Sequence, residues 1–179
     1  MMNPAHAQML QDIRSMVDRS GVQDFLDPYP FRDRPSHMYR CYCWAKRILP
    51  CRPEADAELT LVSTLFHDIG VIATTREKPT PDHDLLGGPI ARDYLLQNGY
   101  APAFADRVAS LVVQHQARER MQDPDTPIEL VILMEADMLD ERGALGILWD
   151  DMAVGAKPLQ AYEGTLARMK VRKLYRRAV

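Results

Sequence analysis

Apolar residues recur at intervals of three and four along almost the whole chain, and this spacing constrains the fold more than any other feature. Residues 5–19 place Met9, Ile13 and Val17 on one helical face, and Gly21 follows as a stop signal. No segment of useful length alternates apolar and polar residues as a half-buried strand does. The sequence therefore predicts an all-α protein.

Prolines and glycines set the expected bounds of the helices. The predicted helices cover, in chain order, about residues 5–19, 36–49, 54–70, 83–98, 102–117, 127–138 and 159–176. The stretches 27–36 and 71–82 are expected as connections, and 143–158 as short helices with turns. Neither an internal repeat nor a shift in composition marks a second domain, so residues 1–179 are predicted to form one helical bundle of about six to eight helices.

The composition narrows the class of protein and its location. Hydrophobic residues make up 46% of the chain and charged residues 26%, which is typical of a globular protein and not of a disordered one. No apolar run approaches the roughly 18 residues that a membrane-spanning helix needs. The N-terminus lacks the features of a signal peptide, and three cysteines make no disulfide framework, so we expect a cytoplasmic protein.

The C-terminal end of the chain differs in charge from the rest. Residues 151–179 carry seven basic and two acidic side chains, although the whole chain has a net charge of −3. We interpret residues 159–176 as an amphipathic helix with solvated lysines and arginines, and we expect no nucleic-acid partner. The same helix could pack on its own bundle or on a second copy of the chain, so a homodimer stays open.

Four of the five histidines and two carboxylates form a set with the chemistry of metal ligands. His67 and Asp68 follow the apolar pair Leu65-Phe66, and Asp137 lies in an apolar helix. Both carboxylates are therefore expected against a core, where an unpaired charge costs several kcal/mol. Taken singly, a histidine on an apolar helix could be a satisfied core residue, Asp137 a buried salt-bridge partner, and His83, between two aspartates, a surface residue. The set consists of His37, His67, Asp68, His83, His115 and Asp137.

The order and spacing of these six residues resemble the HD metallohydrolase superfamily over roughly residues 34–150. The pattern is His, 29 intervening residues, His-Asp, 14 residues, His, 31 residues, His, 21 residues and Asp. It includes the extended motif His67-Asp68-Ile69-Gly70. The resemblance implies a helical bundle of the HD type that gathers metal ligands from several helices.

The resemblance also implies a metal centre with two divalent transition-metal ions. Asp68 would bridge the two ions, and family members that lack the two middle histidines tend to bind only one. Iron is the first expectation and manganese or zinc the alternatives, whereas magnesium prefers oxygen ligands. The first ion would be held by His37, His67, Asp68 and Asp137, and the second by Asp68, His83 and His115.

Phosphoester hydrolysis is the reaction class that we expect first from such a centre. Two cations about 3.5–4 Å apart can lower the pKa of a shared water and stabilise charge on phosphoryl oxygens. Three basic residues near the predicted ligands are candidates to bind a small phosphorylated substrate or a nucleotide: Arg40, Lys78 and Arg118. Asp68, Lys78 and Arg40 are the predicted catalytic residues. Each of the three basic residues could instead be a solvated surface residue.

Three further features lie beside the predicted ligands. Cys41 shares a helix face with His37 and is interpreted as a small core residue in preference to a thiolate ligand. Asp140 lies shortly after the last predicted ligand and could orient a ligand or cap the next turn. Gly87-Gly88 could let a helix pack closely, and no phosphate-loop pattern accompanies them.

Other activities share this ligand set. A minority of HD proteins use a di-iron pair to activate oxygen and cleave a C–C or C–P bond. The stretch from His37 to Gly70 also resembles cyanamide-hydratase-type HD proteins, although His83 departs from the pattern of that group. A binding or regulatory module without catalysis is the remaining alternative. Such modules usually lose ligands, whereas this sequence contains all six.

Overall fold

The computed structural model describes residues 2–26, 33–75 and 82–142, and within these ranges the protein is helical without any strand. The prediction of an all-α protein is confirmed. The α-helices are α1 (Pro4–Ser20), α2 (Gln23–Leu26), α3 (Arg34–Ile48), α4 (Ala57–Phe66), α5 (His83–Gln97), α6 (Pro102–Gln114) and α7 (Ile128–Arg142). Short 3-10 helices are η2 (Leu49–Cys51), η3 (Ile69–Ala73) and η4 (Arg118–Gln122).

Side-chain caps fix where three of the helices begin. The side chains of Asn3, Asp33 and Asp56 accept hydrogen bonds from backbone N–H groups in the first turns of α1, α3 and α4, at 2.9, 2.8 and 3.0 Å. Each cap satisfies a donor that has no partner inside the helix, and such a cap is typically worth about 1 kcal/mol. The cap at Asp33 begins α3 one turn before His37.

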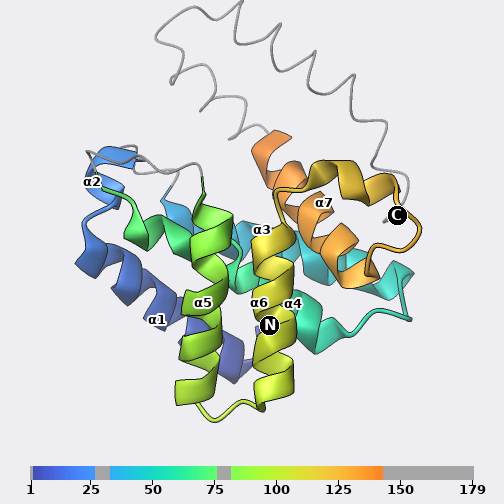
Figure 1. Ribbon diagram of the computed structural model, residues 1–179, viewed down its shortest axis with the longest axis horizontal. Helices are drawn as coiled ribbons and strands as arrows, with labels where there is room; N and C mark the ends of the chain where they lie inside the picture. The colour runs from blue at the N-terminus through green and yellow to red at the C-terminus, as the bar shows by residue number, and fades with distance from the viewer. Residues whose placement is uncertain (1, 27–32, 76–81, 143–179) are drawn as a thin grey trace, which may run out of the picture.

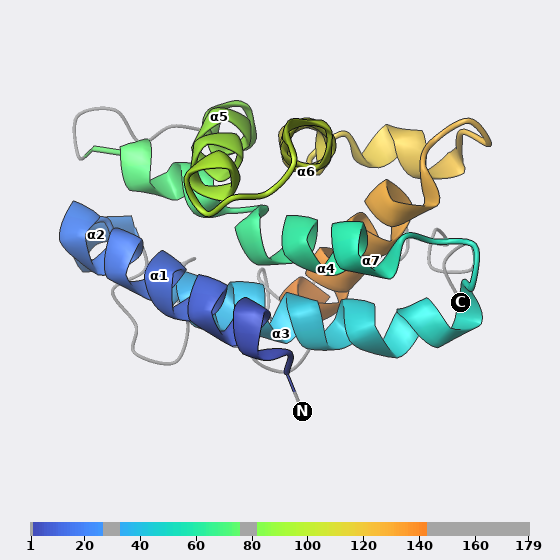
Figure 2. The same cartoon turned by 90° about the horizontal axis from the view of Figure 1, so that it is seen from below.

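Helix α4 is the centre of the bundle (Figures 1 and 2). In Figure 2 it lies between the pair α5 and α6 on one side and the layer of α1 and α3 on the other, and α7 crosses behind it. Most of its residues are buried: Leu59, Thr60, Val62, Ser63, Thr64, Leu65 and Phe66. Among the described residues, no helix combines the length and apolar character needed to cross a membrane.

Glycines allow α5 to pack unusually close to η3 and α6. A Cβ atom on Gly70 would lie 1.8 Å from the carbonyl oxygen of His83, and one on Gly88 would lie 2.5 Å from Val113 Cγ2. A Cβ atom on Gly87 would lie 3.2 Å from the backbone nitrogen of Gly70. A side chain at any of these positions would force a neighbour to shift, and at Gly70 that neighbour is backbone. The close packing brings the first residue of α5 next to the His-Asp pair that precedes η3.

Two helices end earlier than the apolar periodicity predicts. Helices were expected to continue to Gly70 and to residue 117, but α4 ends at Phe66 and α6 at Gln114, with His67 and His115 as the C-caps. Val71, expected in a polar connection, is buried in η3. In the other direction, α7 continues to Arg142, four residues beyond the expected end. The predictions for residues 143–158 and for the basic helix 159–176 lie outside the described residues.

Candidate metal centre

The structure brings all six predicted metal ligands together at the centre of the bundle. They come from helices that are far apart in the sequence, and five of the six are at least 97% buried. The exception is His83, whose side chain is 19% exposed. The contributing positions are His37 in α3, His67 and Asp68 between α4 and η3, His83 at the start of α5, His115 at the end of α6, and Asp137 in α7.

The first group of ligands gathers around the Nε2 atom of His37. That atom lies 3.2 Å from His67 Nε2 and 3.2 Å from Asp137 Oδ1. His67 Nε2 is also 3.8 Å from the same Asp137 oxygen. Two imidazole nitrogens and one carboxylate oxygen thus point at a common position.

The second group gathers around Asp68, whose two oxygens face in different directions. Oδ1 lies 3.0 Å from His83 Nε2 and 3.5 Å from His115 Nε2. Oδ2 lies 3.6 Å from His37 Nε2 and 3.8 Å from His67 Nε2, in the first group. A single buried carboxylate therefore contacts both groups of imidazoles.

Helix ends set the orientation of two of the rings. Because α4 and α6 end at His67 and His115, the carbonyl oxygens of Thr64 and Val112 lie in the last helical turn, where acceptors lack their i+4 partner. The Val112 oxygen also accepts a long bond of 3.4 Å from the backbone N–H of His115. The Nδ1 atoms of His67 and His115 donate to these two oxygens at 2.8 and 2.7 Å. An Nδ1–H donor leaves Nε2 with its lone pair, which is the form of imidazole that binds metals.

A carboxylate performs the same task for the third ring. His37 Nδ1 lies 2.7 Å from Asp140 Oδ2, and Arg40 donates to both oxygens of Asp140 at 2.7 and 3.0 Å. Hydrogen bonding between a ligand histidine and a carboxylate fixes the ring and raises its basicity. Asp140 is therefore in position to orient His37, one of the two roles that the sequence left open for it.

The donor set fits first-row transition metals. Imidazole nitrogens and carboxylate oxygens bind such ions at about 2.0–2.2 Å, so ligand atoms on one ion lie roughly 3 to 3.6 Å apart. Most separations in the cluster, from 3.0 to 3.6 Å, fall within this range, and that between His67 Nε2 and Asp137 Oδ1, at 3.8 Å, is slightly longer. The cluster could thus hold metal in two adjoining groups, one of His37, Cys41, His67 and Asp137 and the other of Asp68, His83 and His115. Asp68 Oδ2 also faces the two imidazoles of the first group.

The charges around the cluster keep its carboxylates ionised. Burial opposes ionisation, but Arg118 and the neighbouring imidazoles hold the pKa of Asp137 well below its usual range. The pKa of Asp68 is also well lowered, by His67 and Arg34 against the effect of burial. Glu135, in the same helix as Asp137, has neither carboxylate oxygen hydrogen-bonded, and burial raises its pKa to about 7. The contrast shows that the partners of Asp137, and not the helix, set its charge.

The predicted substrate-binding cations are placed differently from one another. Arg40 is bound to Asp140, and its contact with a substrate stays a prediction. Arg118 donates to Asp137 Oδ2 and, at 2.9 Å, to the carbonyl oxygen of Met134, so its described contacts hold a candidate ligand in place. Lys78 lies outside the described residues.

Sequence reasoning missed two residues at the cluster. Arg34 Nη1 donates to Asp68 Oδ2 at 2.8 Å, and the amide nitrogen of Gln116 lies 3.0 Å from His115 Nε2. The only signal for Arg34 was its place one helical turn before His37, which puts the two side chains on the same face. Gln116 gave no signal beyond its position next to a histidine.

Cys41 lies beside the first group. Its Sγ atom is 3.7 Å from Nδ1 and 3.8 Å from Nε2 of His37, and it lies within 4.8 Å of the ligand atoms of His37, His67 and Asp137, so the sulfur is within reach of a metal held there. Burial raises the pKa of its thiol to about 12, which disfavours the thiolate form and agrees with the interpretation of Cys41 as a core residue.

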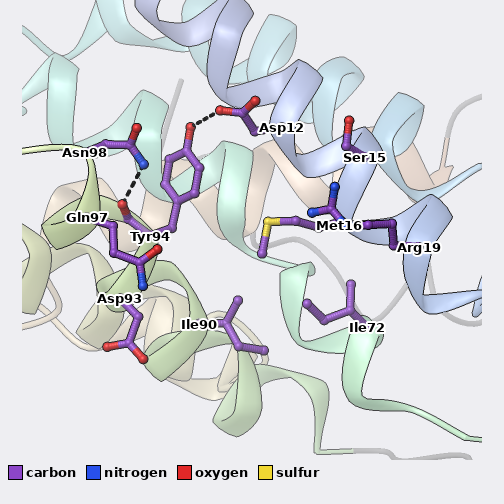
Figure 3. A pocket seen from close by; sticks show the side chains of 10 residues that line it. All are labelled: Asp12, Ser15, Met16, Arg19, Ile72, Ile90, Asp93, Tyr94, Gln97 and Asn98. Atoms are coloured by element: carbon purple, nitrogen blue, oxygen red, sulfur yellow. Dashed lines mark hydrogen bonds between the residues drawn. The ribbon is translucent and has the colours of Figure 1, made fainter.

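A cavity of about 550 Å³ lies away from the cluster, between α1, η3 and α5 (Figure 3). Met16, Ile72 and Ile90 supply apolar side chains, and the Tyr94 hydroxyl donates to Asp12 Oδ2 at 2.6 Å. None of the six clustered residues lines it. The cavity is therefore separate from the candidate metal centre.

The family model for the HD domain matches residues 34–142, which is more than half of the chain and contains all six clustered residues. This chain belongs to the HD domain family. The resemblance inferred from the spacing of the histidines is confirmed. The matched range begins at Arg34, the first residue of α3, and ends at Arg142, the last residue of α7.

Among solved structures, this HD protein is similar to a crystal structure described as a predicted HD superfamily hydrolase from an uncultured Thermotogales bacterium. The two share 23% sequence identity with a TM-score of 0.62, and the alignment covers 97% of this chain and 98% of that one. At this identity the likeness shows the fold. No match was found among curated proteins.

Proposed function

We propose that this HD protein is a metal-dependent phosphohydrolase that cleaves a small phosphoester or a nucleotide at a dinuclear centre. The observation that carries the proposal is the position of Asp68, whose two oxygens face two separate groups of imidazoles. Iron is the proposed metal, with manganese or zinc as alternatives. The similar structure is described as a predicted HD superfamily hydrolase, which agrees with this reaction class.

The proposal assigns the ligands by group. Two divalent cations held there would supply a water of lowered pKa and would stabilise charge on phosphoryl oxygens. Asp68 is the proposed bridge, and its role as a ligand of both ions makes it a catalytic residue. The first ion takes His37, His67 and Asp137 in addition, and the second takes His83 and His115.

Other residues of the chain position these ligands. Thr64, Val112 and Asp140 accept from the Nδ1 atoms of three histidines, and Arg118 holds the outer oxygen of Asp137. Arg40 acts on the first group through Asp140, and we keep Arg40 and Lys78 as proposed contacts to the phosphoryl group. We further propose that residues 1–179 form a single cytoplasmic HD domain.

Metal analysis and a panel of substrates test the proposal. Protein purified without chelators should contain up to two transition-metal ions per chain. After loading with Fe²⁺ or Mn²⁺, it should release phosphate or a nucleoside product from a panel of phosphomonoesters, nucleotides and cyclic dinucleotides. The hydroxyl group from water ends on phosphorus and the proton on the leaving oxygen.

Three results would contradict the proposal. If the fully metal-loaded protein hydrolyses no member of the panel, the proposed phosphohydrolase activity is wrong. Oxygen consumption that depends on an organic substrate would replace it with a di-iron oxygenase. Release of urea from cyanamide would replace it with a hydratase.

A further inference from the structure

Two arginines contact the buried aspartates of the cluster, and they do so at different oxygens. Arg34 Nη1 donates at 2.8 Å to Asp68 Oδ2. That oxygen is the one that faces the first group, at 3.6 Å from His37 Nε2 and 3.8 Å from His67 Nε2. The guanidinium of Arg34 therefore binds the same carboxylate oxygen that a cation in the first group would use.

Arg118 makes the opposite arrangement with Asp137. It contacts Oδ2, whereas Oδ1 is the oxygen that lies 3.2 Å from His37 Nε2 and 3.8 Å from His67 Nε2. Its second described bond goes to the carbonyl oxygen of Met134 at 2.9 Å. Arg118 can thus keep both contacts while a cation binds the inner oxygen of Asp137.

Charge explains why Arg34 is placed on Asp68. An ionised carboxylate that is 97% buried is costly without a positive partner, and the guanidinium supplies one. A divalent cation in the first group would take over this role and would repel a guanidinium on the same oxygen. The side chain of Arg34 is 18% exposed, so it has a path away from Asp68 toward solvent.

We propose that Arg34 leaves Asp68 Oδ2 when a divalent cation binds the first group, and that its guanidinium then binds an anionic oxygen of the substrate. This inference rests on the proposed phosphohydrolase function. Guanidinium groups match the geometry of phosphate because they can donate two parallel hydrogen bonds. Arg34 would act as a substrate-binding residue only in the metal-loaded protein, and Arg118 would remain a positioning residue.

A metal titration distinguishes Arg34 from Arg118, because substitution of the two arginines should change the Mn²⁺ affinity in opposite directions. Full-length protein is stripped with chelator and titrated with Mn²⁺ in a calorimeter. Arg34→Gln should bind the first Mn²⁺ about 10-fold more tightly, since no guanidinium must be displaced. Arg118→Gln, the matched control, should bind it about 10- to 100-fold more weakly, because Asp137 loses its support.

Binding of inorganic phosphate to the Mn²⁺-loaded protein tests the second part of the proposal, that Arg34 binds an anionic oxygen of the substrate. Arg34→Gln should weaken phosphate binding about 10- to 100-fold, the usual loss when a charged hydrogen bond is removed. Arg34→Lys should keep the metal affinity of the wild type and recover part of the phosphate affinity. It also provides a folded variant if Arg34→Gln unfolds in the chelator-treated state, as thermal melting would show.

The outcomes are distinguishable. If Arg34→Gln binds Mn²⁺ no more tightly than the wild type, or binds phosphate equally well, the inference is wrong. If both shifts appear but no phosphoester is hydrolysed by the loaded wild type, the role of Arg34 is supported and the proposed phosphohydrolase is contradicted.

Discussion

Asp68 is the residue on which the geometry of the cluster most depends. Its Oδ1 contacts His83 and His115, and its Oδ2 faces His37 and His67. Other carboxylates and imidazoles of the cluster serve one group only. Substitution at this position should therefore affect both groups at once, whereas substitution of any other ligand should affect mainly one.

Asp68→Ala should lose metal from both groups and should abolish activity, because each group loses an oxygen ligand. His115→Ala should lose mainly one ion per chain. Elemental analysis of both variants after identical loading measures the difference, and Asp106→Ala, a surface carboxylate paired with Arg92, is the control. Full metal content in Asp68→Ala would show that the carboxylate is not shared.

Asp140→Ala should weaken metal binding by the first group about 10- to 100-fold, because the His37 ring loses the acceptor that orients it. Arg40→Ala should have a smaller effect in the same direction, since it acts through Asp140. Competition between the protein and a metal-sensitive dye measures both affinities. An Arg40→Ala effect larger than that of Asp140→Ala would instead indicate a direct role for the guanidinium.

At the residue scale, the sequence identified the chemically distinctive side chains and missed their supports. Histidines are rare in this chain, so their spacing alone selected His37, His67, His83 and His115. The acceptors of their Nδ1 atoms are mostly backbone carbonyls, which every residue has, so no pattern of residue types could indicate them. Arg34 was missed because its one signal, a place one helical turn before His37, is not distinctive for one arginine among many.

At the scale of elements, the placement of α5 depends on the glycine that ends the His-Asp-Ile-Gly motif. A Cβ atom on Gly70 would lie 1.8 Å from the carbonyl oxygen of His83 and 2.6 Å from the nitrogen of Gly87. Both neighbours are backbone atoms and cannot rotate away. A side chain at this position must therefore push the start of α5, with His83, away from Asp68.

Gly70→Ala should lose mainly the metal held by the second group and should destabilise the protein by about 1–3 kcal/mol or more, as overpacking does. Metal content and urea unfolding of the same sample measure the two effects. Gly21→Ala is the matched control: nothing lies within 4 Å of its Cβ position, but its φ of 66° strains the backbone. It should lose stability of about 1 kcal/mol with no loss of metal. Equal metal loss in the two variants would rule out the steric explanation.

The sequence predicted the existence of the helices better than their ends. Apolar periodicity identifies a buried face, and it continued through residues that belong to η3 after α4. The helices end at Phe66 and Gln114, where the next residue in each case is a histidine whose Nδ1 atom donates a capping hydrogen bond to a carbonyl oxygen of the last turn. This bond depends on the conformation of a single side chain, and hydrophobic spacing carries no information about it.

At the scale of the whole molecule, the buried carboxylates link stability to pH in the metal-free protein. The pKa values of Asp68 and Asp137 lie well below the ordinary 3.8. Groups with a lowered folded pKa stabilise the fold above that ordinary value, and this stability is lost as pH falls through the folded pKa. Two buried histidines act in opposite directions at higher pH, because the pKa of His67 is lowered to about 4 and that of His37 is raised.

The free energy of unfolding should therefore fall steeply below pH about 4 in the presence of chelator. Urea unfolding at pH 5, 4 and 3 measures the decline. Asp137→Asn should flatten it, because one carboxylate with a lowered pKa is gone, whereas Asp106→Asn should not. A decline of the same steepness in wild type and Asp137→Asn would show that Asp137 contributes nothing to acid sensitivity.

The fold as a whole was predictable because one kind of periodicity runs through the chain. What the sequence could not supply is how α5 meets η3 and α6. That arrangement depends on close backbone contacts at Gly70 and Gly88, whose partners lie 13 or more residues away. Contacts of this kind follow from packing in three dimensions, and a glycine in a sequence indicates only that one of them could exist.

The ring-capped helix ends limit how this centre can be re-engineered for another metal. At positions 67 and 115, one nitrogen of the ring satisfies a backbone carbonyl while the other points into the cluster. Aspartate or cysteine could replace the inward-facing atom but not the outward donor, so a ligand exchange there would also remove the side-chain bond to the Thr64 or Val112 carbonyl. His83 makes no such backbone bond within the described residues, and it is the position at which a designer could change donor chemistry with the least damage to the scaffold.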